Sequence, residues 1–218
     1  STALMRAAHG GQQACVKALL RAKANTELLA EGGQTALQWA EFKGHTAVTE
    51  LIRQHAAPPQ PATASPARDG KAEGLLQDIG EMRRPAVSSS ASLPLEILKS
   101  AEQGELQKVV IWLDTGGLVD TIGTFGLLHA AAGWGHLEMV RELLKRGASV
   151  DLPNGLGSTA LMDAAYHGYL SILLVLLQHS ANPDLQAKIG QTALMGAASG
   201  GQEACVKALL RAKANTEL

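Results

Sequence analysis

Apolar residues recur along this chain in short stretches of helical spacing, separated by glycine and polar residues. In MVRELL (139–144) and CVKALL (15–20), the apolar positions predict helices that bury one side. The same layout returns in unit after unit, and most units begin with threonine. The unit heads are Thr2, Thr35, Gly126, Thr159 and Thr192. Adjacent heads lie 33 residues apart within each of the two runs, which indicates a repeat protein.

The two ends of the sequence carry nearly the same repeat, because residues 1–28 and 191–218 differ at only four positions. In such a unit a threonine can cap the first helix, and two alanines let that helix lie close to a neighbour. A mid-unit glycine such as Gly11 or Gly201 ends the helix in the left-handed conformation, and a second apolar helix follows. Each helix–turn–helix unit has apolar groups on both broad sides, so it can bury them only by stacking on other units.

The segment GLLHAAAGWGHLEMVRELLKRGASVD (126–151) resembles the ankyrin repeat, whose pattern is T-P-L-H-x-A-A-x-x-G-H-x-x-x-V-x-x-L-L-x-x-G-A. The other units are similar but depart from it in two ways. Only His129 keeps the histidine, and alanine replaces the proline at Ala3, Ala36, Ala160 and Ala193. The resemblance implies an all-α ankyrin-repeat solenoid of stacked helix–turn–helix units with short hairpin loops. It also implies that partners bind the concave surface made by the hairpin tips and the first helices.

Composition divides the chain into three parts. Residues 1–57 hold one repeat and a unit with a polar second half before Pro58, which is typical of a C-terminal cap. Residues 58–91 are rich in Pro, Ala and Ser, and this composition predicts a linker. Residues 92–218 hold an N-terminal cap repeat with a charged first helix, followed by three repeats.

The caps stand in reverse order, so the repeats at Thr2 and at Leu218 each present an uncovered stacking face. Three arrangements remain open. At about 3.3 Å per extended residue the linker is long enough for the two faces to meet within one chain, which then forms one array. The faces can instead meet between chains, as a swapped dimer or a filament. In the third arrangement, the ends are the limits of a segment of a longer protein with several such arrays.

The overall composition narrows the classes of partner. With 19 basic and 20 acidic residues the formal net charge is -1, and no block of charge favours nucleic acid or a membrane surface. The most apolar run, LSILLVLLQH, is too short to cross a bilayer. Cys15 and Cys205 hold the same repeat position, which favours a packing role over a disulfide or a metal site. We therefore expect a cytoplasmic or nuclear protein without cofactor or metal.

Aromatic and histidine residues next to the mid-unit glycines are the candidate partner contacts. Trp and Tyr bury a large area at low entropic cost, so a cluster of such residues on successive repeats is the first candidate patch. The cluster is Trp134, Tyr166, His167 and Tyr169. The further candidates are His9 and Phe42 in other units and Asn154, Leu156 and Lys188 in the hairpins. The alternative is that these residues serve packing, as we expect of the Gly-His histidines His45 and His136.

No motif for catalysis or phosphate binding accompanies the repeats. The histidines fall at repeat positions, and no glycine-rich turn is followed by Lys-Ser or Lys-Thr. The sequence therefore predicts a noncatalytic scaffold that binds a protein partner, whose identity it does not reveal. The alternative is a structural role, as a self-assembling or circularly permuted repeat unit joined through its uncovered faces.

Overall fold

Short α-helices, joined in pairs, make up the described part of the chain. The computed structural model describes residues 1–55, 93–121 and 126–218, so the predicted linker lies outside the described residues. Over these ranges the chain forms twelve α-helices and no strand. They are α1 (Ala3–His9), α2 (Gln13–Arg21), α3 (Ala36–Phe42), α4 (Thr46–His55), α5 (Leu95–Glu102), α6 (Leu106–Asp114), α7 (Leu127–Gly133), α8 (Leu137–Lys145), α9 (Ala160–His167), α10 (Leu170–Gln178), α11 (Ala193–Ser199) and α12 (Glu203–Arg211).

Threonine caps explain where the first helix of most repeats begins. The side chains of Thr2, Thr35 and Thr192 each accept a hydrogen bond from the backbone N–H three residues further on, at 3.3–3.4 Å. Thr159 makes no such bond, although its backbone has the same extended conformation. Its Oγ1 is buried and has no hydrogen-bond partner among the described residues. The predicted cap is therefore confirmed at three of the four threonines.

The mid-unit glycines let successive repeats approach closely. Gly135 has a φ of +86°, and a Cβ built on it would lie 2.8 Å from the ring of Tyr169 in the next repeat. Only a residue without a Cβ fits both the left-handed conformation and this contact. The equivalent glycines Gly11, Gly44, Gly104, Gly168 and Gly201 also have positive φ angles.

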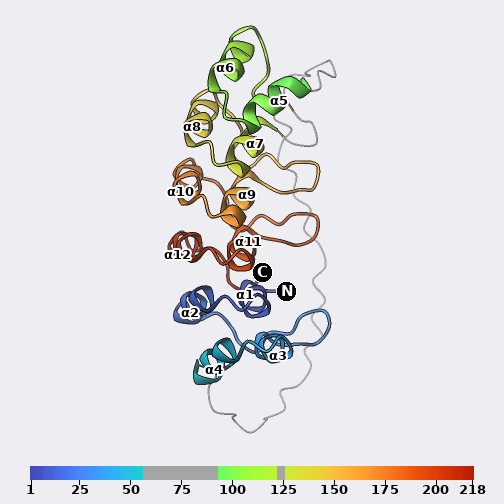
Figure 1. Ribbon diagram of the computed structural model, residues 1–218, viewed down its shortest axis with the longest axis vertical. Coiled ribbons are helices and arrows are strands. Elements are labelled where there is room, and N and C mark those ends of the chain that lie inside the picture. The colour runs from blue at the N-terminus through green and yellow to red at the C-terminus, as the bar shows by residue number, and fades with distance from the viewer. Residues whose placement is uncertain (56–92, 122–125) are drawn as a thin grey trace, which may run out of the picture. The chain divides into compact units, whose positions relative to one another are not determined.

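The helix pairs stack on one another in a fixed order (Figure 1). First helices contact first helices in the order α5, α7, α9, α11, α1 and α3. Second helices contact each other in the order α8, α10, α12, α2 and α4. Segments Ser1–Ala56 and Ser92–Leu218 thus belong to one compact unit. Where α11 meets α1, the side chain of Gln12 lies against Gly201, in the register in which His136 lies against Gly104.

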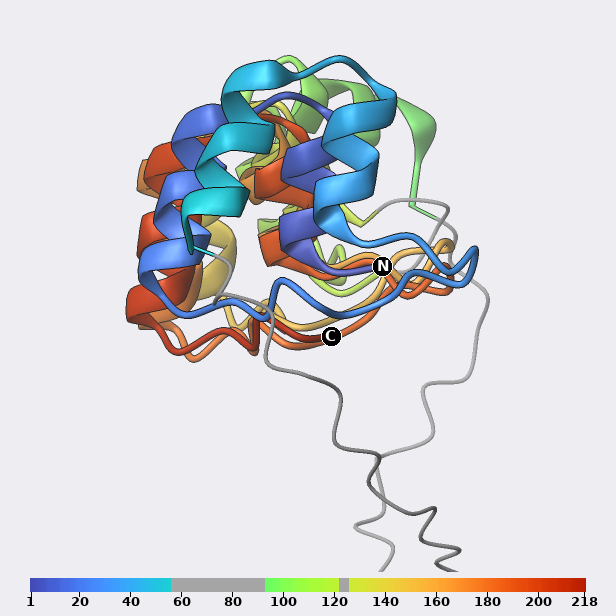
Figure 2. The same cartoon turned by 90° about the horizontal axis from the view of Figure 1, so that it is seen from below.

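The core of the stack is made of leucines and small residues at equivalent positions of each repeat. Leu4, Leu128, Leu161 and Leu194 are all 0–6% exposed, and paired alanines further along the same helices are buried as well. Burial of each leucine contributes about 1.5–3 kcal/mol. Seen along the stack, first and second helices form two layers, and the hairpin turns project to one side (Figure 2). The predicted all-α solenoid of helix–turn–helix units is confirmed.

Candidate functional site

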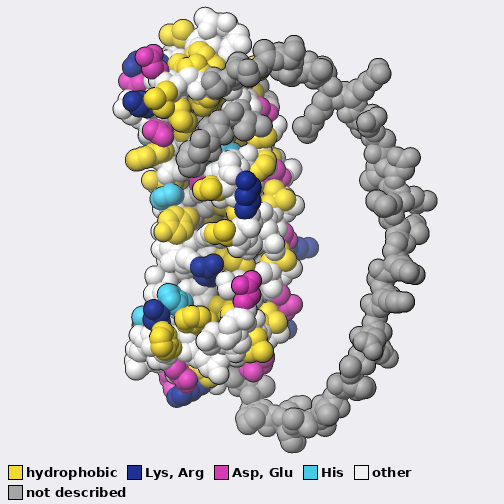
Figure 3. Space-filling view, turned by 90° about the vertical axis from the view of Figure 1, so that its right-hand side faces the viewer, with side chains coloured by type: hydrophobic (Ala, Val, Ile, Leu, Met, Phe, Trp, Pro, Cys, Tyr) yellow, Lys and Arg dark blue, Asp and Glu magenta, His cyan; other side chains and the backbone are white. Residues whose placement is uncertain are grey.

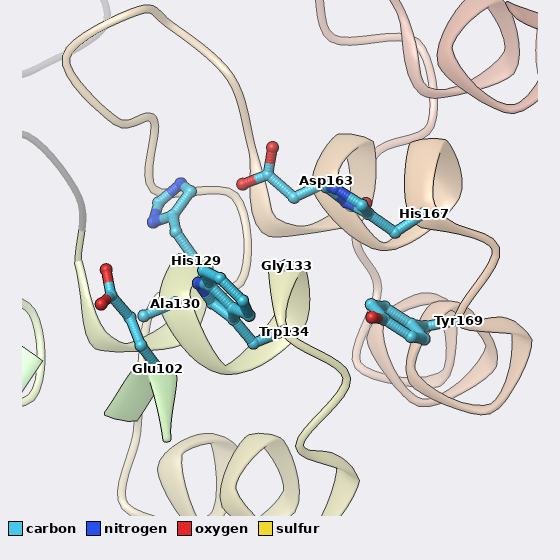
Figure 4. A pocket seen from close by; sticks show the side chains of 8 residues that line it. All are labelled: Glu102, His129, Ala130, Gly133, Trp134, Asp163, His167 and Tyr169. Carbon is cyan, nitrogen blue, oxygen red and sulfur yellow. The ribbon is translucent and has the colours of Figure 1, made fainter. Parts of the chain in front are cut away.

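The face formed by the first helices and the hairpin turns carries hydrophobic side chains along its length, with histidines beside them (Figure 3). A hollow of about 410 Å³ opens on it between α5, α7 and α9. Its lining residues are Glu102, His129, Ala130, Gly133, Trp134, Asp163, His167 and Tyr169, and they come from three successive helix pairs (Figure 4). We call this the acidic hollow.

Small residues on α7 create the space in the acidic hollow. Ala130 and Gly133 lie one turn apart on this helix, and both line the hollow. A Cβ built on Gly133 would meet only the Cβ of Asp163 within 4 Å, at 3.8 Å. The corresponding position in the next repeat is occupied by Tyr166, so a large side chain is compatible with the fold at this place.

The structure brings the predicted aromatic cluster together. Trp134 follows the end of α7 and is 61% exposed, and Tyr166 near the end of α9 is 50% exposed. The ring of His167 packs edge-on against Tyr166, with centroids 5.2 Å apart, and stacks on Tyr169 at 6.0 Å. Trp134, His167 and Tyr169 line the hollow, and Tyr166 lies next to it. Exposed aromatic groups of this kind offer a large contact area to a partner.

Two carboxylates of the acidic hollow are absent from the sequence-based candidates. Asp163 on α9 is half-buried, and its carboxylate makes no hydrogen bond or ion pair within the part of the chain that the structure describes. Burial raises the pKa of Asp163 to about 6, against a smaller opposite effect of His167. Glu102 at the end of α5 is also half-buried. One feature of the sequence points to Asp163: it holds the same repeat position as Arg6 and Trp39, between residues that are buried.

The histidines of the Gly-His pairs, and one buried histidine, serve the packing of repeats. His136 donates from Nε2 to the carbonyl of Glu102 at 2.7 Å, and His45 donates to that of His9 at 3.1 Å. His129 is 3% exposed and donates from Nε2 to the carbonyl of Ser158 at 3.0 Å. Burial lowers the pKa of His129, so its imidazole is neutral at pH 7. The structural role expected of His45 and His136 agrees with these bonds, and His129 has a role of the same kind.

A second hollow, of about 350 Å³, lies on the same face between α1, α3 and α11. We call it the basic hollow; its lining residues are Ser1, Met5, Arg6, His9, Gly10, Ala30, Trp39 and Ser199. The predicted contacts His9 and Phe42 flank Trp39, with ring centroids 5.2 and 6.2 Å from its own. Desolvation, together with the nearby charges of Lys43 and Arg6, lowers the pKa of His9. Trp39, which completes this cluster, was not among the sequence-based candidates.

The predicted hairpin contacts divide into exposed and structural residues. Leu156 is 62% exposed at a hairpin tip. Lys188 is exposed as well, and its Nζ donates to the carbonyl of Gly155 at 2.8 Å. Asn154 differs from the expectation, because it is only 7% exposed. Its Oδ1 accepts from the backbone N–H groups of Leu156 and Ser158, at 2.9 and 3.0 Å, so its side chain holds the turn instead of facing a partner.

A metal site, a membrane-spanning helix and a reactive thiol each place requirements on the described residues. Within them, no group of three or more His, Cys, Asp or Glu side chains is placed to hold a metal ion. No helix among them is long and apolar enough to cross a membrane. Cys15 and Cys205 are buried free thiols, and burial raises the pKa of Cys15 to about 11, which makes it a poor nucleophile.

Stacked helix pairs with exposed aromatic hollows define a solenoid repeat protein of the protein-binding class. The sequence matches the family of ankyrin repeats (three copies) over residues 1–61 and 99–187, and the single ankyrin repeat over 189–218. The chain therefore belongs to the ankyrin repeat family.

Among curated proteins, the chain is similar to plant ubiquitin ligases over part of its length. It is 36% identical over 75 residues to E3 ubiquitin-protein ligase XBAT32 of Arabidopsis thaliana, which covers 33% of this chain and 15% of that protein. Probable E3 ubiquitin-protein ligase XBOS33 of Oryza sativa subsp. japonica matches at the same identity over 14% of its length. The chain thus spans only a small part of the length of these relatives.

Proposed function

We propose that this chain is a noncatalytic interaction module whose protein partner contacts the face formed by the first helices and the hairpin turns. One observation carries the proposal: Trp134 and Tyr166 stand 61% and 50% exposed beside a hollow of about 410 Å³. Large aromatic side chains left in water at a concave place are typical anchors of an interface. The ankyrin repeats across the chain support a role in protein–protein contact.

The similarity to ubiquitin ligases supports protein binding, and it supports no more specific function. The match covers 75 residues, which is about two repeats and 15% of the ligase. We propose that the shared segment does in this chain what a repeat segment can do by itself, which is to bind another protein. Ligase activity is not part of the proposal, because fold similarity does not transfer chemistry.

A double substitution at the aromatic cluster tests the proposal. Proteins retained by the intact chain from a cell extract are compared with those retained by Trp134→Ala with Tyr166→Ala. Leu174→Ala is the matched control, because Leu174 is 44% exposed on the second helix α10. We expect the double variant to lose its specific partners and the control to keep them. Equal retention by all three proteins would refute the proposed face.

A second role, the joining of the uncovered repeats, has a specific observation in its favour. Helix α1 contacts α11, and α2 contacts α12. The register at this joint matches that of the other joints, since Gln12 lies against Gly201. We propose that the two segments of the chain join there as one array. Light scattering over a hundredfold range of protein concentration tests this: a constant monomer mass supports joining within the chain, and a rising mass assigns the faces to contacts between copies.

A further inference from the structure

We propose that the acidic hollow receives an arginine side chain of the protein partner. The inference rests on the proposed function and specifies the chemistry of the group that enters the site. It depends on the charges of the hollow, on its aromatic lining, and on a comparison among the repeats of the same chain.

The charges of the hollow are uncompensated. Asp163 and Glu102 both line it, and none of its lining residues is lysine or arginine. Neither carboxylate is among the hydrogen-bonded or ion-paired side chains of the described residues, although both are half-buried. A half-buried carboxylate without a partner costs stability, and a cation placed beside Asp163 would offset that cost. The other titratable groups that line the hollow are His129, which is neutral, and His167, together with the phenol of Tyr169.

The aromatic lining favours a guanidinium over an ammonium group. The exposed indole of Trp134 and the ring of Tyr169 both border the hollow. A guanidinium is planar, stacks on aromatic faces, and directs several N–H donors to carboxylates at once. An ammonium group makes point contacts and holds its hydration water more firmly. An arginine on an exposed partner segment therefore fits the hollow better than a lysine.

The repeats themselves show that the fold does not require an acidic group here. The position of Asp163 is occupied by other residue types in the remaining repeats: Arg6, Trp39, Ala130 and Gly196. The position of Gly133 likewise differs among repeats: His9, Phe42, Tyr166 and Ser199. The acidic hollow thus arises from two residues of neighbouring repeats, the small Gly133 and the carboxylate of Asp163. Neither residue replaces one of the buried leucines or paired alanines that hold the repeats together.

A titration with three small probes tests the inference. N-acetyl-arginine methylamide, its lysine analogue and its neutral citrulline analogue are added separately to the full chain at pH 7.5. The readout is the indole N–H signal of Trp134 in the NMR spectrum, identified by its absence in Trp134→Phe. We expect a saturable shift with the arginine probe, a response at least several-fold weaker with lysine, and none with citrulline.

Three variants locate the binding. Asp163→Asn keeps the shape of the side chain and removes its charge, so we expect the arginine probe to bind at least tenfold more weakly. Gly133→Tyr, which copies Tyr166 of the next repeat, fills the hollow and should abolish the response; if it fails to fold, Asp163→Asn decides. Glu138→Gln, a charge removed from the exposed surface of α8, is the matched control and should bind the probe like the intact chain.

The outcomes separate this inference from the proposed function. An equal response to citrulline, an equal or stronger response to lysine, or full binding by Asp163→Asn would each overturn the arginine assignment. If partners retained by the intact chain are lost in the Trp134→Ala, Tyr166→Ala variant but kept by Asp163→Asn, the proposed face stands and the arginine site does not. If all variants retain the same proteins, the proposed function fails.

Discussion

The acidic hollow and the basic hollow lie on one face of one stack, yet they offer opposite charges to a partner. Asp163 in the first and Arg6 in the second hold the same repeat position, four residues after the threonine that precedes the helix. Each hollow contains a tryptophan and a histidine. The difference between them therefore comes from a few side chains and not from the backbone.

The buried residues of the two repeats explain why such exchanges are possible. Leu4 and Leu161 are both completely buried, and paired alanines follow them in each helix at equivalent places. These positions fix the distance between repeats, since any added volume there would push neighbours apart. The position of Asp163 and Arg6 lies at the edge of the core: Arg6 is exposed, Asp163 is half-buried and Ala130 is buried there, so residues of different size and charge fit. A repeat array can thus change what it binds without changing how it folds.

Reversing the charge of the acidic hollow should have the largest effect. Asp163→Arg gives this repeat the residue that the other hollow already has, and the partner's cation then meets a like charge. We expect a loss of about 3 kcal/mol, or roughly a hundredfold in affinity, for the arginine probe. The same NMR titration measures it. A response within about threefold of the intact chain would show that the two hollows do not differ in the way described.

The converse exchange is the control for that variant. Arg6→Asp leaves the acidic hollow intact, so the arginine probe should bind there as before. It also removes a cation that lowers the pKa of His9. We therefore expect the pKa of His9 to rise, which an NMR pH titration of that imidazole follows. An unchanged pKa of His9 would indicate that Arg6 does not set the charge of the basic hollow.

Neutralising Asp163 should stabilise the protein while it weakens binding. The pKa of Asp163 is about 6 in the folded state and 3.8 as the reference for an unfolded chain, so the folded state binds the proton more tightly. The ionised carboxylate therefore destabilises the fold above pH 6, and this penalty disappears as the pH falls below 4. We expect Asp163→Asn to raise the free energy of unfolding by about 1–3 kcal/mol at pH 7.5.

Urea unfolding at pH 7.5 and at pH 4 measures this effect, and the difference between variant and intact chain should nearly vanish at the lower pH. Arg6→Ala provides the comparison, because Arg6 is exposed and its removal should change stability by less than about 0.5 kcal/mol. If Asp163→Asn and Arg6→Ala both changed the free energy of unfolding by similarly small amounts, Asp163 would be well solvated.

The sequence predicts the shared features of the two hollows better than their differences. Period, glycines and apolar spacing are local patterns, so the fold and the positions of Trp134 and Phe42 on its surface could be read from them. The hollow that Asp163 lines could not, because Glu102 and Gly133, which line it as well, belong to other helix pairs. Asn154 is a predicted partner contact, but its side chain holds the turn instead. An asparagine in a turn can face solvent or bind the backbone of its own turn, and only the hairpin geometry decides between the two.

The bonds that tie neighbouring repeats together beside the two hollows should make a smaller contribution. His136 donates to the carbonyl of Glu102 at 2.7 Å, next to the acidic hollow, whereas Gln202 reaches the carbonyl of Tyr166 only at 3.5 Å. We expect His136→Ala to cost about 1 kcal/mol and Gln202→Ala clearly less. Thermal unfolding of both variants compares them. An equal loss would assign the effect to lost packing on the mid-unit glycines and not to the hydrogen bond.

The smallest expected effect concerns the starts of the two helices that carry Arg6 and Asp163. Thr2 caps α1 through its hydroxyl, whereas the Oγ1 of Thr159 before α9 is buried without a partner among the described residues. Thr2→Ala should therefore cost about 0.5–1 kcal/mol, because a helix cap is lost. Thr159→Val keeps the shape and removes an unsatisfied hydroxyl, so it should leave stability unchanged or raise it by a few tenths of a kcal/mol. Urea unfolding distinguishes the two signs, and destabilisation by Thr159→Val would show that its hydroxyl does cap α9 in solution.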